Sequence, residues 1–552
     1  MEILNGKRGF RFKKYSLKIK FIINKLTNKI VTEQNELIKR RLEELEEIKK
    51  LGINPYPHRY DVSATSKEII SNFKDPESEE EKEKQKGITV SVAGRIVAVR
   101  KMGKATFCHI KDEDGKIQLY IRKDDVEDTA YSTLKLLDIG DIIGAKGFVF
   151  RTKTGEVSIH TNEFTLLTKT LCPLPVVKEE ITETGEKIIH DAFADVELRY
   201  RQRYIDLIVN DNVKETFINR SKIIKSIKTT LESYKFFEVE TPTLQTIYGG
   251  ANARPFVTHH NALDINLYLR ISNELFLKRL VVGGFSRVFE FVKDFRNEGI
   301  DRTHNPEFTQ VEWYQAYGDY NDSMNLFEEV VEKACIAVHG TTKIQYQGTE
   351  LEFKRPWKRL KMADAIKEKT GLDVPAVSKD EMLKYMKENN IEFDPKITHS
   401  KGLVISTLFE ATCEEDLIQP TFVIDHPIDS TPLCKPLRQY SIEQLEEMKK
   451  DPEQVIFVER FEPYINKWEL GNSYTELNDP ILQRRLFEEQ VERGRGGEEE
   501  THPMDDDFLN AIEIGMPPTT GVGLGVDRLV MLLTNSVNIR DVILFPLMRP
   551  IS

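Results

Sequence analysis

Residues 295–317, FRNEGIDRTHNPEFTQVEWYQAY, decide the fold of the C-terminal part of this chain. Polar and apolar residues alternate on both sides of a basic loop, which predicts a strand, a loop and a second strand. On the first arm, Arg296 and Glu298 are expected to share one face. Folded as a hairpin, the two arms would present a guanidinium group, carboxylates and an aromatic ring to one ligand. The second arm is expected to present four residues on one face: Phe308, Gln310, Glu312 and Tyr314.

The loop between the two arms bears on whether this surface binds a ligand. Charged residues that alternate along a hairpin are usually its solvated side, and that explanation would serve for the strands alone. The loop DRTHNPEF also carries His304 and Phe308, whose rings are poorly explained as solvent-facing residues. The loop therefore favours a binding site.

A glycine-rich segment, PPTTGVGLGVDRLVMLL at 517–533, forms a second candidate site. Arg528 opens an apolar helix directly after the glycines. The segment is not the dinucleotide fingerprint, because Val526 stands where the third glycine is required, and the chain has no G-x-x-x-x-G-K-[ST] phosphate loop. Two interpretations stay open here. The glycines allow close packing of a strand and a helix, or Arg528 holds a phosphate at the helix start.

A third candidate is the segment RFEPYINKWELGNSY at 460–474, which predicts a hairpin that turns at Asn466–Lys467. In that register Tyr464 opposes Glu469, and Glu462 is a diagonal neighbour of Glu469 on the same face. Two carboxylates so placed repel each other unless a cation lies between them. Mg²⁺ is the natural candidate, since it takes one or two carboxylates plus phosphate oxygens. The alternative is a pair of exposed acids on a wet hairpin.

The pattern before residue 173 is different. From residue 88 onward, about five short strands occur in about 80 residues, a number and size typical of an oligonucleotide-binding (OB) barrel. Phe107 and Gln118 lie on successive strands and offer a ring for stacking and an amide for base edges. A single phenylalanine in a barrel is more often part of the core, so both interpretations stay open.

Composition limits the class of protein. Of the 552 residues, 39% are hydrophobic and 31% are charged, which is typical of a soluble globular enzyme and excludes collagen-like, mucin-like and fully disordered chains. No apolar run is long enough to span a bilayer. The five cysteines are scattered and include no Cys-x-x-Cys pair, so neither a disulfide framework nor a structural zinc site is expected. This usage predicts a reducing compartment, the cytoplasm.

The net charge of -11 is unevenly distributed. Residues 1–30 hold nine Lys or Arg and one acid, Glu2. Three interpretations compete for this extension: a targeting peptide, a basic tRNA-binding arm, or translation from upstream of a true start at Val31. Targeting is disfavoured because Lys outnumbers Arg seven to two and Ser16 is the only serine. Our hypothesis is that residues 1–30 are disordered and dispensable.

Taken together, these segments resemble the class II aminoacyl-tRNA synthetases. FRNE…HNPEFTQVE is similar to the second motif of that family and GVGLGVDR to the third. FFEVETPTL, at 236–244, is similar to the first, which in the family lies at the dimer interface. The family usually carries glycine before the aromatic pair, whereas this chain has Lys235, a departure that concerns the local turn. HIGH and KMSKS, the signatures of the other synthetase class, are absent.

The resemblance is to the bacterial-type lysyl-tRNA synthetases, and it extends from about Thr32 to Ser552. A barrel before the catalytic domain marks the subgroup for lysine, aspartate and asparagine. YGGANARPF, LRISNELFLKRLVVGGF and NSYTELNDP then favour lysine. Free lysine carries two ammonium groups and one carboxylate, so its pocket needs an excess of carboxylates, and Glu274, Glu312 and Glu476 supply them. An aspartate pocket would need a cation, and these segments offer none to spare.

The resemblance implies ATP-dependent attachment of L-lysine to tRNA(Lys) through a lysyl-adenylate, by a homodimer that uses Mg²⁺. Asn472, Tyr474 and Glu476 are expected to share a strand face. The implied catalytic residues are Arg296 and Arg528. The implied lysine-binding residues are Gly250, Glu274, Glu312, Tyr314, Asn472, Tyr474 and Glu476, with Glu274 and Glu312 at the α-amino group and Glu476 and Tyr314 at the ε-ammonium group. The implied ATP-binding residues are Arg296, Glu298, His304, Asn305, Phe308 and Arg528. The implied metal ligands are Glu462 and Glu469, and the implied anticodon-binding residues are Phe107 and Gln118.

The expected fold class is α+β and multidomain, with a five-stranded OB barrel and a class II catalytic domain built on an antiparallel sheet. The expected parts are a basic extension at 1–30, a helix and connector at 31–86, an anticodon-binding barrel at 87–172, a linker at 173–198, and a catalytic domain at 199–552 with a helical insertion near 360–396. Two alternatives remain: a relative that transfers lysine to a protein, and a catalytically inactive RNA-binding relative. Such transferases lack the barrel, and every matched catalytic position here keeps a competent side chain.

Overall fold

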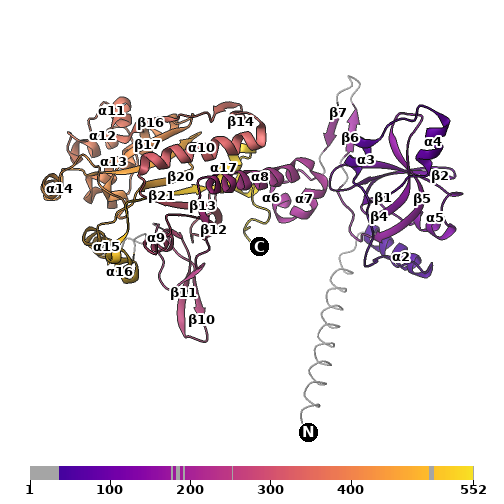
Figure 1. Ribbon diagram of the computed structural model, residues 1–552, viewed down its shortest axis with the longest axis horizontal. Coiled ribbons are helices and arrows are strands. Elements are labelled where there is room, and N and C mark those ends of the chain that lie inside the picture. Colours follow the sequence, from indigo (N-terminus) through magenta and orange to yellow (C-terminus); the bar gives the residue numbers. More distant parts are fainter. Residues whose placement is uncertain are drawn as a thin grey trace, which may run out of the picture. The chain divides into compact units, whose positions relative to one another are not determined.

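The computed structural model describes residues 36–175, 178–181, 187–190, 193–251, 253–495 and 503–550. The hypothesis about residues 1–30 lies outside this part of the chain. The chain divides into two units, Met1–Ala192 and Phe193–Ser552, each of which is described by itself. Figure 1 shows the two units as the indigo-to-violet and the magenta-to-yellow parts of the ribbon.

The second unit is built on one large sheet. Its strand order is β16-β17-β18-β20-β21-β13-β12-β8, and β19 pairs with β18. All pairings from β17 to β12 are antiparallel, as predicted, whereas the outermost pairings, β16 with β17 and β12 with β8, are parallel. The strands are β8 (Phe237–Glu238), β12 (Arg287–Phe295), β13 (Glu307–Ala316), β16 (Lys358–Lys361), β17 (Thr421–Pro427), β18 (Phe457–Ile465), β19 (Trp468–Glu469), β20 (Gly471–Thr475) and β21 (Thr519–Gly525).

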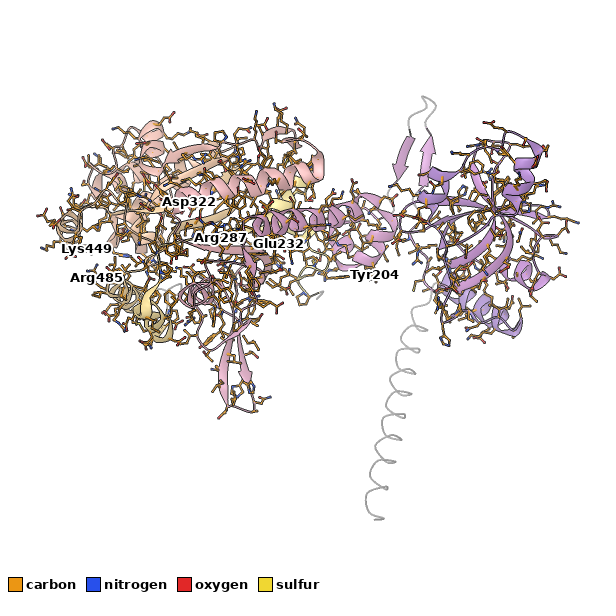
Figure 2. All side chains as sticks on the ribbon, viewed as in Figure 1. Tyr204, Glu232, Arg287, Asp322, Lys449 and Arg485 are labelled. Atoms are coloured by element: carbon orange, nitrogen blue, oxygen red, sulfur yellow. The ribbon has the colours of Figure 1, made fainter. Side chains whose placement is uncertain are left out.

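Long helices cover this sheet. α8 (Asp211–Ser233), α10 (Tyr320–His339) and α17 (Val526–Leu533) contribute buried apolar residues to the core beside the sheet. Figure 2 marks α8 by Glu232 and α10 by Asp322. At the centre of this core, the ring of Phe327 lies 6.2 Å from Trp313 and 5.9 Å from Phe422, centroid to centroid. The sheet is thereby held rigid behind the strands that carry the predicted site.

The remaining elements of the second unit surround this layer. The helix-rich segment near the predicted insertion has a core of its own, which includes Ile366, Met382 and Leu408. The helices are α6 (Val196–Arg201), α7 (Arg203–Val209), α9 (Glu274–Val282), α11 (Met362–Thr370), α12 (Lys379–Glu388), α13 (Lys401–Thr412), α14 (Ile442–Met448), α15 (Pro480–Arg495) and α16 (Asp506–Gly515). The minor strands are β9 (Leu244–Gln245), β10 (Val257–His260), β11 (Ile265–Leu269), β14 (Lys343–Tyr346) and β15 (Thr349–Glu352).

The departure at Lys235 is resolved by the backbone. Lys235 adopts φ 64°, the left-handed conformation that glycine favours, directly before Phe236 and β8. Its N–H donates to Glu232 O at 2.9 Å, so the turn after α8 is kept. A residue with a Cβ pays roughly 1–2 kcal/mol in this conformation. The chain therefore retains the turn of the family with a less favourable residue.

The first unit is a closed five-stranded barrel in the order β1-β2-β3-β5-β4, as predicted. Residues that alternate along the strands, such as Cys108, Ile110 and Leu119, are buried in its core. The strands are β1 (Thr89–Met102), β2 (Ala105–Lys111), β3 (Lys116–Arg122), β4 (Ile142–Arg151) and β5 (Val157–Thr168). A separate pair, β6 (Lys178–Ile181) and β7 (Lys187–His190), follows the barrel. The helices are α2 (Glu36–Lys50), α3 (Ser66–Asn72), α4 (Glu79–Lys86) and α5 (Asp128–Leu134).

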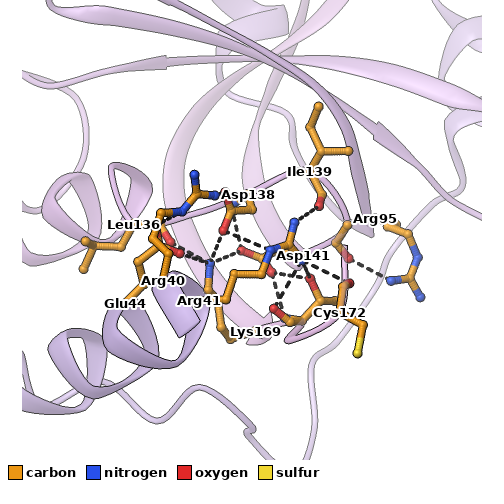
Figure 3. Close-up of polar contacts among 12 residues, drawn as sticks. Arg40, Arg41, Glu44, Arg95, Leu136, Asp138, Ile139, Asp141, Lys169 and Cys172 are labelled. Atoms are coloured by element: carbon orange, nitrogen blue, oxygen red, sulfur yellow. Dashed lines mark hydrogen bonds and ion pairs between the residues drawn. The ribbon is translucent and has the colours of Figure 1, made fainter. Parts of the chain in front are cut away.

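Helix α2 packs onto the barrel, and its apolar residue Ile48 belongs to the barrel core. A buried network of charges beside this contact fixes the helix (Figure 3). Lys169 Nζ donates to Glu44 on α2 at 3.0 Å and to Asp138 at 2.9 Å. Although burial lowers the pKa of Lys169, its hydrogen bond to Asp138 and the charge of Asp141 outweigh this effect and raise it. A buried ammonium group paired in this way ties α2 to the barrel.

The charged segment before the barrel is more regular than predicted. The sequence predicts a solvated connector at residues 75–86, and Glu79–Lys86 instead forms the helix α4. None of its residues is buried, and Lys82 pairs with Glu79 at 3.1 Å on its surface. Side-chain pairs at this spacing stabilise a helix that has no apolar face. Among the described residues, no helix is both long and apolar enough to cross a membrane.

Candidate active site

A cavity of about 330 Å³ lies over the strands β13, β20 and β21 of the large sheet. Most of the predicted site residues of this unit line it: Gly250, Glu274, Arg296, Glu298, His304, Asn305, Phe308, Glu312, Tyr314, Glu469, Asn472, Tyr474 and Arg528. Glu462 and Glu476 are not part of the lining. The antiparallel register explains how residues far apart in sequence meet here, because Glu312 and Asn472 both pair with Gly523, and Tyr474 pairs with Gly521.

The glycines of β21 make room for this arrangement. A Cβ at Gly521 would lie 2.2 Å from Tyr314 Cε1 and 2.2 Å from Glu476 Oε1. Real Cβ atoms do not approach other atoms so closely, so the side chains on the neighbouring strands require glycine at this position. The close-packing interpretation of the glycine segment therefore holds for Gly521, but the packing is between strands at the cavity rather than between a strand and a helix.

The first arm of the central hairpin differs from the prediction. Strand β12 ends at Phe295, so the expectation that Arg296 and Glu298 share a strand face is wrong. Arg296 N still donates to Pro306 O at 2.9 Å, but Asn297 N donates to Arg254 O at 2.8 Å and draws the chain away from the ladder. Both side chains nevertheless line the cavity from this loop. A contact to a distant segment ends the strand, which alternation alone does not reveal.

One end of the cavity is cationic. The guanidinium carbon of Arg296 lies 5.2 Å from the centre of the Phe308 ring, and Arg296 Nε has no hydrogen-bond partner among the described residues. Arg528 Nη1 donates to Glu469 O, and Nη2 donates to His304 Nε2 at 3.1 Å. These two arginines and the Phe308 ring can accept an anion and a planar base at the same end.

The loop that carries His304 is held by Asp301. The carboxylate of Asp301 contacts His304 Nδ1 at 2.7 Å and accepts from Thr303 N at 2.7 Å. Although burial raises the pKa of Asp301, the hydrogen bonds from His304 and Thr303 outweigh it and lower that pKa to about 2. Asp301 is therefore ionised at neutral pH and fixes which ring nitrogen of His304 faces Arg528.

The opposite end of the cavity is acidic and buried. Glu274 Oε2 accepts from the Tyr474 hydroxyl at 2.6 Å. Glu312 accepts from Gln310 Nε2 at 2.6 Å and from Tyr314 at 3.2 Å. Burial raises the pKa of Glu312 well above its ordinary value, and the nearby charges of Asp294 and Glu274 add to the rise. Such crowding of carboxylates is unfavourable, and a cationic ligand would relieve it.

Glu476 lies behind this acidic end. Strand β20 stops at Thr475, but Glu476 continues the pairing through its N–H, which donates to Thr519 O at 2.8 Å. The side chain is fully buried. Its Oε1 points to Gly521 and has no hydrogen-bond partner among the described residues, while Oε2 forms an ion pair with Lys278. Glu476 therefore presents one carboxylate oxygen at the wall formed by Gly521.

Lys278 is the functional candidate that the sequence analysis missed. It lies on α9, is fully buried, and donates to Glu274 Oε1 at 2.5 Å. Lys278 is a cation at this acidic end, but two carboxylates engage it, so it is not spare in the sense of the sequence-based expectation. The spacing of Glu274 and Lys278, four residues apart in a predicted helix, is a signal that could have identified the pair.

The hairpin at the cationic end has the predicted register. Tyr464 pairs with Glu469, and the turn residues Asn466 and Lys467 have φ of 51° and 68°. Burial raises the pKa of Glu469, and the charge of Glu462 raises it further. In the described part of the chain, no three His, Cys, Asp or Glu side chains are grouped as a protein-only metal site. The two carboxylates of the hairpin fit a cation that takes one or two carboxylates and completes its shell with ligand oxygens, as Mg²⁺ does.

A second candidate site lies on the barrel. Phe107 is absent from the core and contacts Tyr120 on the neighbouring strand, with ring centroids 5.0 Å apart. Gln118 lies on the strand next to that of Phe107. It is only 8% exposed, and its Nε2 already donates to Glu156 at 2.7 Å. The sequence analysis missed the other rings that join Phe107 in a continuous aromatic patch, whose members are Phe107, Tyr120, Phe148, Phe150 and His160.

Both units of the chain match known protein families. Residues 90–167 match the family described as "OB-fold nucleic acid binding domain", and residues 195–549 match the family described as "tRNA synthetases class II (D, K and N)". Three curated relatives carry the name Lysine--tRNA ligase. That of Pelotomaculum thermopropionicum is 48% identical over 94% of this chain and 95% of its own length. That of Porphyromonas gingivalis is 47% identical over 95% and 87%, and that of Carboxydothermus hydrogenoformans is 49% identical over 94% and 99%. The chain belongs to the class II tRNA synthetases, in the group designated D, K and N.

Proposed function

We propose that this protein attaches L-lysine to tRNA(Lys) at the expense of ATP, through a lysyl-adenylate. The observation that carries the proposal is the polarity of the cavity. Arg296 and Arg528 form a cationic end, while Glu274 and Glu312 form an acidic end with Glu476 behind them. A free lysine molecule matches these charges, because its one carboxylate can face the arginines while its two ammonium groups face the glutamates. The names of the relatives support the same substrate.

The first step joins lysine to AMP. The lysine carboxylate attacks the α-phosphorus of ATP in line, and pyrophosphate leaves. Arg296 would hold the attacking carboxylate and the α-phosphate, and Arg528 would hold the distal phosphates, while Phe308 stacks on the adenine. Positioning and charge stabilisation of this kind suffice, and no side chain acts as a nucleophile. Glu298, His304 and Asn305 complete the proposed nucleotide site.

The amino-acid end of the substrate is held by the acidic end of the cavity. Glu274 and Glu312 are proposed to bind the α-amino group, with Gly250 leaving room beside Glu274. Gly250 has φ 87°, and a Cβ there would lie 3.0 Å from Glu274 Cβ. Glu476 and Tyr314 are proposed to bind the ε-ammonium group. Asn472 and Tyr474 line the space between.

Glu462 and Glu469 are proposed to hold Mg²⁺. When bound, the ion would neutralise charge on the ATP phosphates. The two carboxylates also contact cations of the protein itself: Arg460 Nη2 donates to Glu462 at 2.6 Å, and Arg528 Nη1 lies 3.6 Å from Glu469 Oε2. These two arginines orient the carboxylates before ATP arrives.

In the second step, the terminal adenosine hydroxyl of tRNA(Lys) takes the lysyl group from the adenylate. The tRNA is proposed to be recognised at its anticodon by the aromatic patch of the barrel. Phe107 supplies a stacking face, and Gln118, oriented by Glu156 and by the Ser158 hydroxyl at 2.9 Å, supplies an amide for a base edge. The cytoplasmic location expected from the cysteines stays a prediction.

The Phe107→Ala variant should separate tRNA recognition from adenylate formation. Stacking contributes about 1 to 3 kcal/mol per base, so tRNA charging is expected to fall roughly 10- to 100-fold through the KM for tRNA. Lysine-dependent pyrophosphate exchange should be unchanged. Phe73→Ala is the matched control, because that ring lies under Arg151, at 5.3 Å, instead of joining the aromatic patch. Equal losses of both activities would place Phe107 in a structural role.

A homodimer is proposed to form through the first family motif. Several apolar side chains of this region are exposed, among them Phe237 at 60%, Leu244 at 49% and Phe285 at 43%. Phe237 and Phe285 stack with centroids 5.8 Å apart and form an apolar surface that a second copy would cover. Phe237→Asp is expected to convert the dimer to a monomer in sedimentation experiments. An unchanged sedimentation coefficient, in parent and variant alike, would contradict this interface.

The function is tested by pyrophosphate exchange measured with each amino acid in turn. Lysine is expected to support exchange, and aspartate and asparagine are not. Transfer is then measured to tRNA(Lys) and, separately, to protein. The barrel argues against a protein-directed transferase, and the retained arginines and glutamates argue against an inactive relative. Exchange without tRNA charging would favour the first alternative, and no exchange with any amino acid would favour the second.

A further inference from the structure

Lys278 has no part in the reaction as described above, yet it is the most deeply buried cation at the acidic end of the cavity. It is fully buried, and its ammonium group contacts both Glu274 and Glu476. It also lies 5.4 Å from the centre of the Tyr474 ring and 6.0 Å from that of Phe508. Burying a charged group is costly unless it is paired, so a purely structural role would be better served by an apolar side chain.

The contacts of Lys278 place the oxygens of the two carboxylates in different environments. Glu274 gives Oε1 to Lys278 and Oε2 to the Tyr474 hydroxyl, and so both of its oxygens are engaged. Neither oxygen of Glu476 has a geometrically formed hydrogen bond among the described residues, but Oε2 forms the ion pair with Lys278, whereas Oε1 lies at Gly521. The ion pair therefore fixes which oxygen of Glu476 is offered to a ligand.

We propose that Lys278 is a positioning residue for the amino-acid substrate: it bridges Glu274 and Glu476 and leaves Oε1 of Glu476 as the acceptor for the terminal ammonium group of lysine. This inference rests on the proposed function. Without Lys278, the two carboxylates would repel each other in a buried space, and one of them would take up a proton. A protonated Glu476 could no longer supply the counter-charge of the substrate.

The surroundings of Glu476 give the inference a pH signature. The groups that face it are Lys278 and Glu274 on α9, Tyr474 on β20, Tyr314 on β13 and the Cys434 thiol. Burial raises the pKa of Glu476 to about 8, the ammonium group of Lys278 opposes this rise, and Glu274 adds to it. A raised pKa means that the neutral form predominates below it, so lysine binding should strengthen as the pH rises towards that value. Free lysine keeps its ε-ammonium charge until about pH 10.

The test compares the parent protein with Lys278→Met, which removes the charge and keeps an unbranched side chain. The KM for lysine is measured in pyrophosphate exchange from pH 6.5 to 9.5, together with the KM for ATP. In the variant, the midpoint of the pH profile of the lysine KM is expected to move upward by about one pH unit or more. That shift corresponds to a roughly 10-fold higher lysine KM at pH 7. The KM for ATP should stay constant.

Two further variants control for charge and for burial. Lys278→Arg keeps the charge and should restore much of the parent pH profile. Lys401→Met removes another buried lysine, 4% exposed, whose ammonium group donates to Glu453 O at 2.9 Å away from the cavity, and should leave the profile unchanged. If Lys278→Met does not fold, Lys278→Gln takes its place with the same expectation.

The possible outcomes are distinct. An unshifted pH profile in Lys278→Met would overturn the inference, as would equal rises in the KM for lysine and for ATP at every pH, which indicate general damage to the cavity. Absence of lysine-dependent exchange in the parent would overturn the proposed function and this inference with it. The positioning role is supported if the pH profile of the lysine KM shifts upward in Lys278→Met while the KM for ATP is constant, and if Lys278→Arg restores much of the parent profile.

Discussion

Glu476→Gln is expected to abolish lysine activation while the fold is retained. The variant keeps the shape of the side chain but removes the negative charge beside Gly521 that is proposed to bind the ε-ammonium group of lysine. Removing one partner of a buried ion pair costs about 3 to 5 kcal/mol, whereas a missing methylene costs only about 1 to 3 kcal/mol. Measured above pH 8, where Glu476 is ionised, lysine-dependent pyrophosphate exchange should therefore fall roughly 10²- to 10⁴-fold in kcat/KM.

The control for this variant is Glu328→Gln. Glu328 is also a buried carboxylate, 4% exposed, and it pairs with Arg359 at 3.1 Å in the helical layer rather than at the cavity. It should lose stability in thermal unfolding and keep its exchange activity per folded molecule. If Glu476→Gln activated lysine as well as the parent does, Glu476 would be removed from the substrate site.

Arg296→Met is expected to have the second largest effect. Arg296 is the one residue proposed to contact both reacting partners, the lysine carboxylate and the α-phosphate. Its Nε is buried and has no hydrogen-bond partner in the described part of the chain, so the site is prepared for an anionic ligand. Removing one preorganised donor at a developing charge typically costs 10²- to 10³-fold in rate. Pyrophosphate exchange should fall by about this factor at every lysine concentration.

Two comparisons sharpen this prediction. Arg296→Lys should recover only part of the loss, because an ammonium group cannot bind a carboxylate or phosphate through two parallel hydrogen bonds. Arg485→Met is the neutral control, since Arg485 lies on the helix α15 (Figure 2) and its side chain is outside the cavity lining. A full recovery with Lys would mean that Arg296 acts only through its charge.

Much of the fold and of the site follows from local patterns. Alternation and turn residues are local, and so the barrel, the central hairpin and the turn at Asn466–Lys467 could all be predicted. The register of that turn even places Tyr464 opposite Glu469. The side chains on alternate positions of β13 reach the cavity as expected, because a strand with one buried face admits only one register.

What the sequence could not supply depends on contacts between distant segments. The end of β12 at Phe295 is set by the bond from Asn297 to Arg254, which alternation does not encode. Lys278 could be paired with Glu274 from its helical spacing, but its contact with Glu476 requires the sheet to be assembled. The engagement of Gln118 by Glu156 likewise needs the closed barrel. In the last two cases a side chain that looks available in the sequence has a partner in the fold.

The attachment of α2 to the barrel determines where the anticodon-binding module can be cut from the chain and exchanged. Ile48 fills the barrel core and Glu44 is one of three carboxylates that pair with the buried Lys169, so a barrel cut free at residue 87 would expose a hole and lose one of these partners. The smallest transplantable module therefore begins at α2. Exchange of anticodon-binding modules between synthetases, whether by recombination in nature or by grafting in the laboratory, is expected to succeed only when the junction precedes this helix.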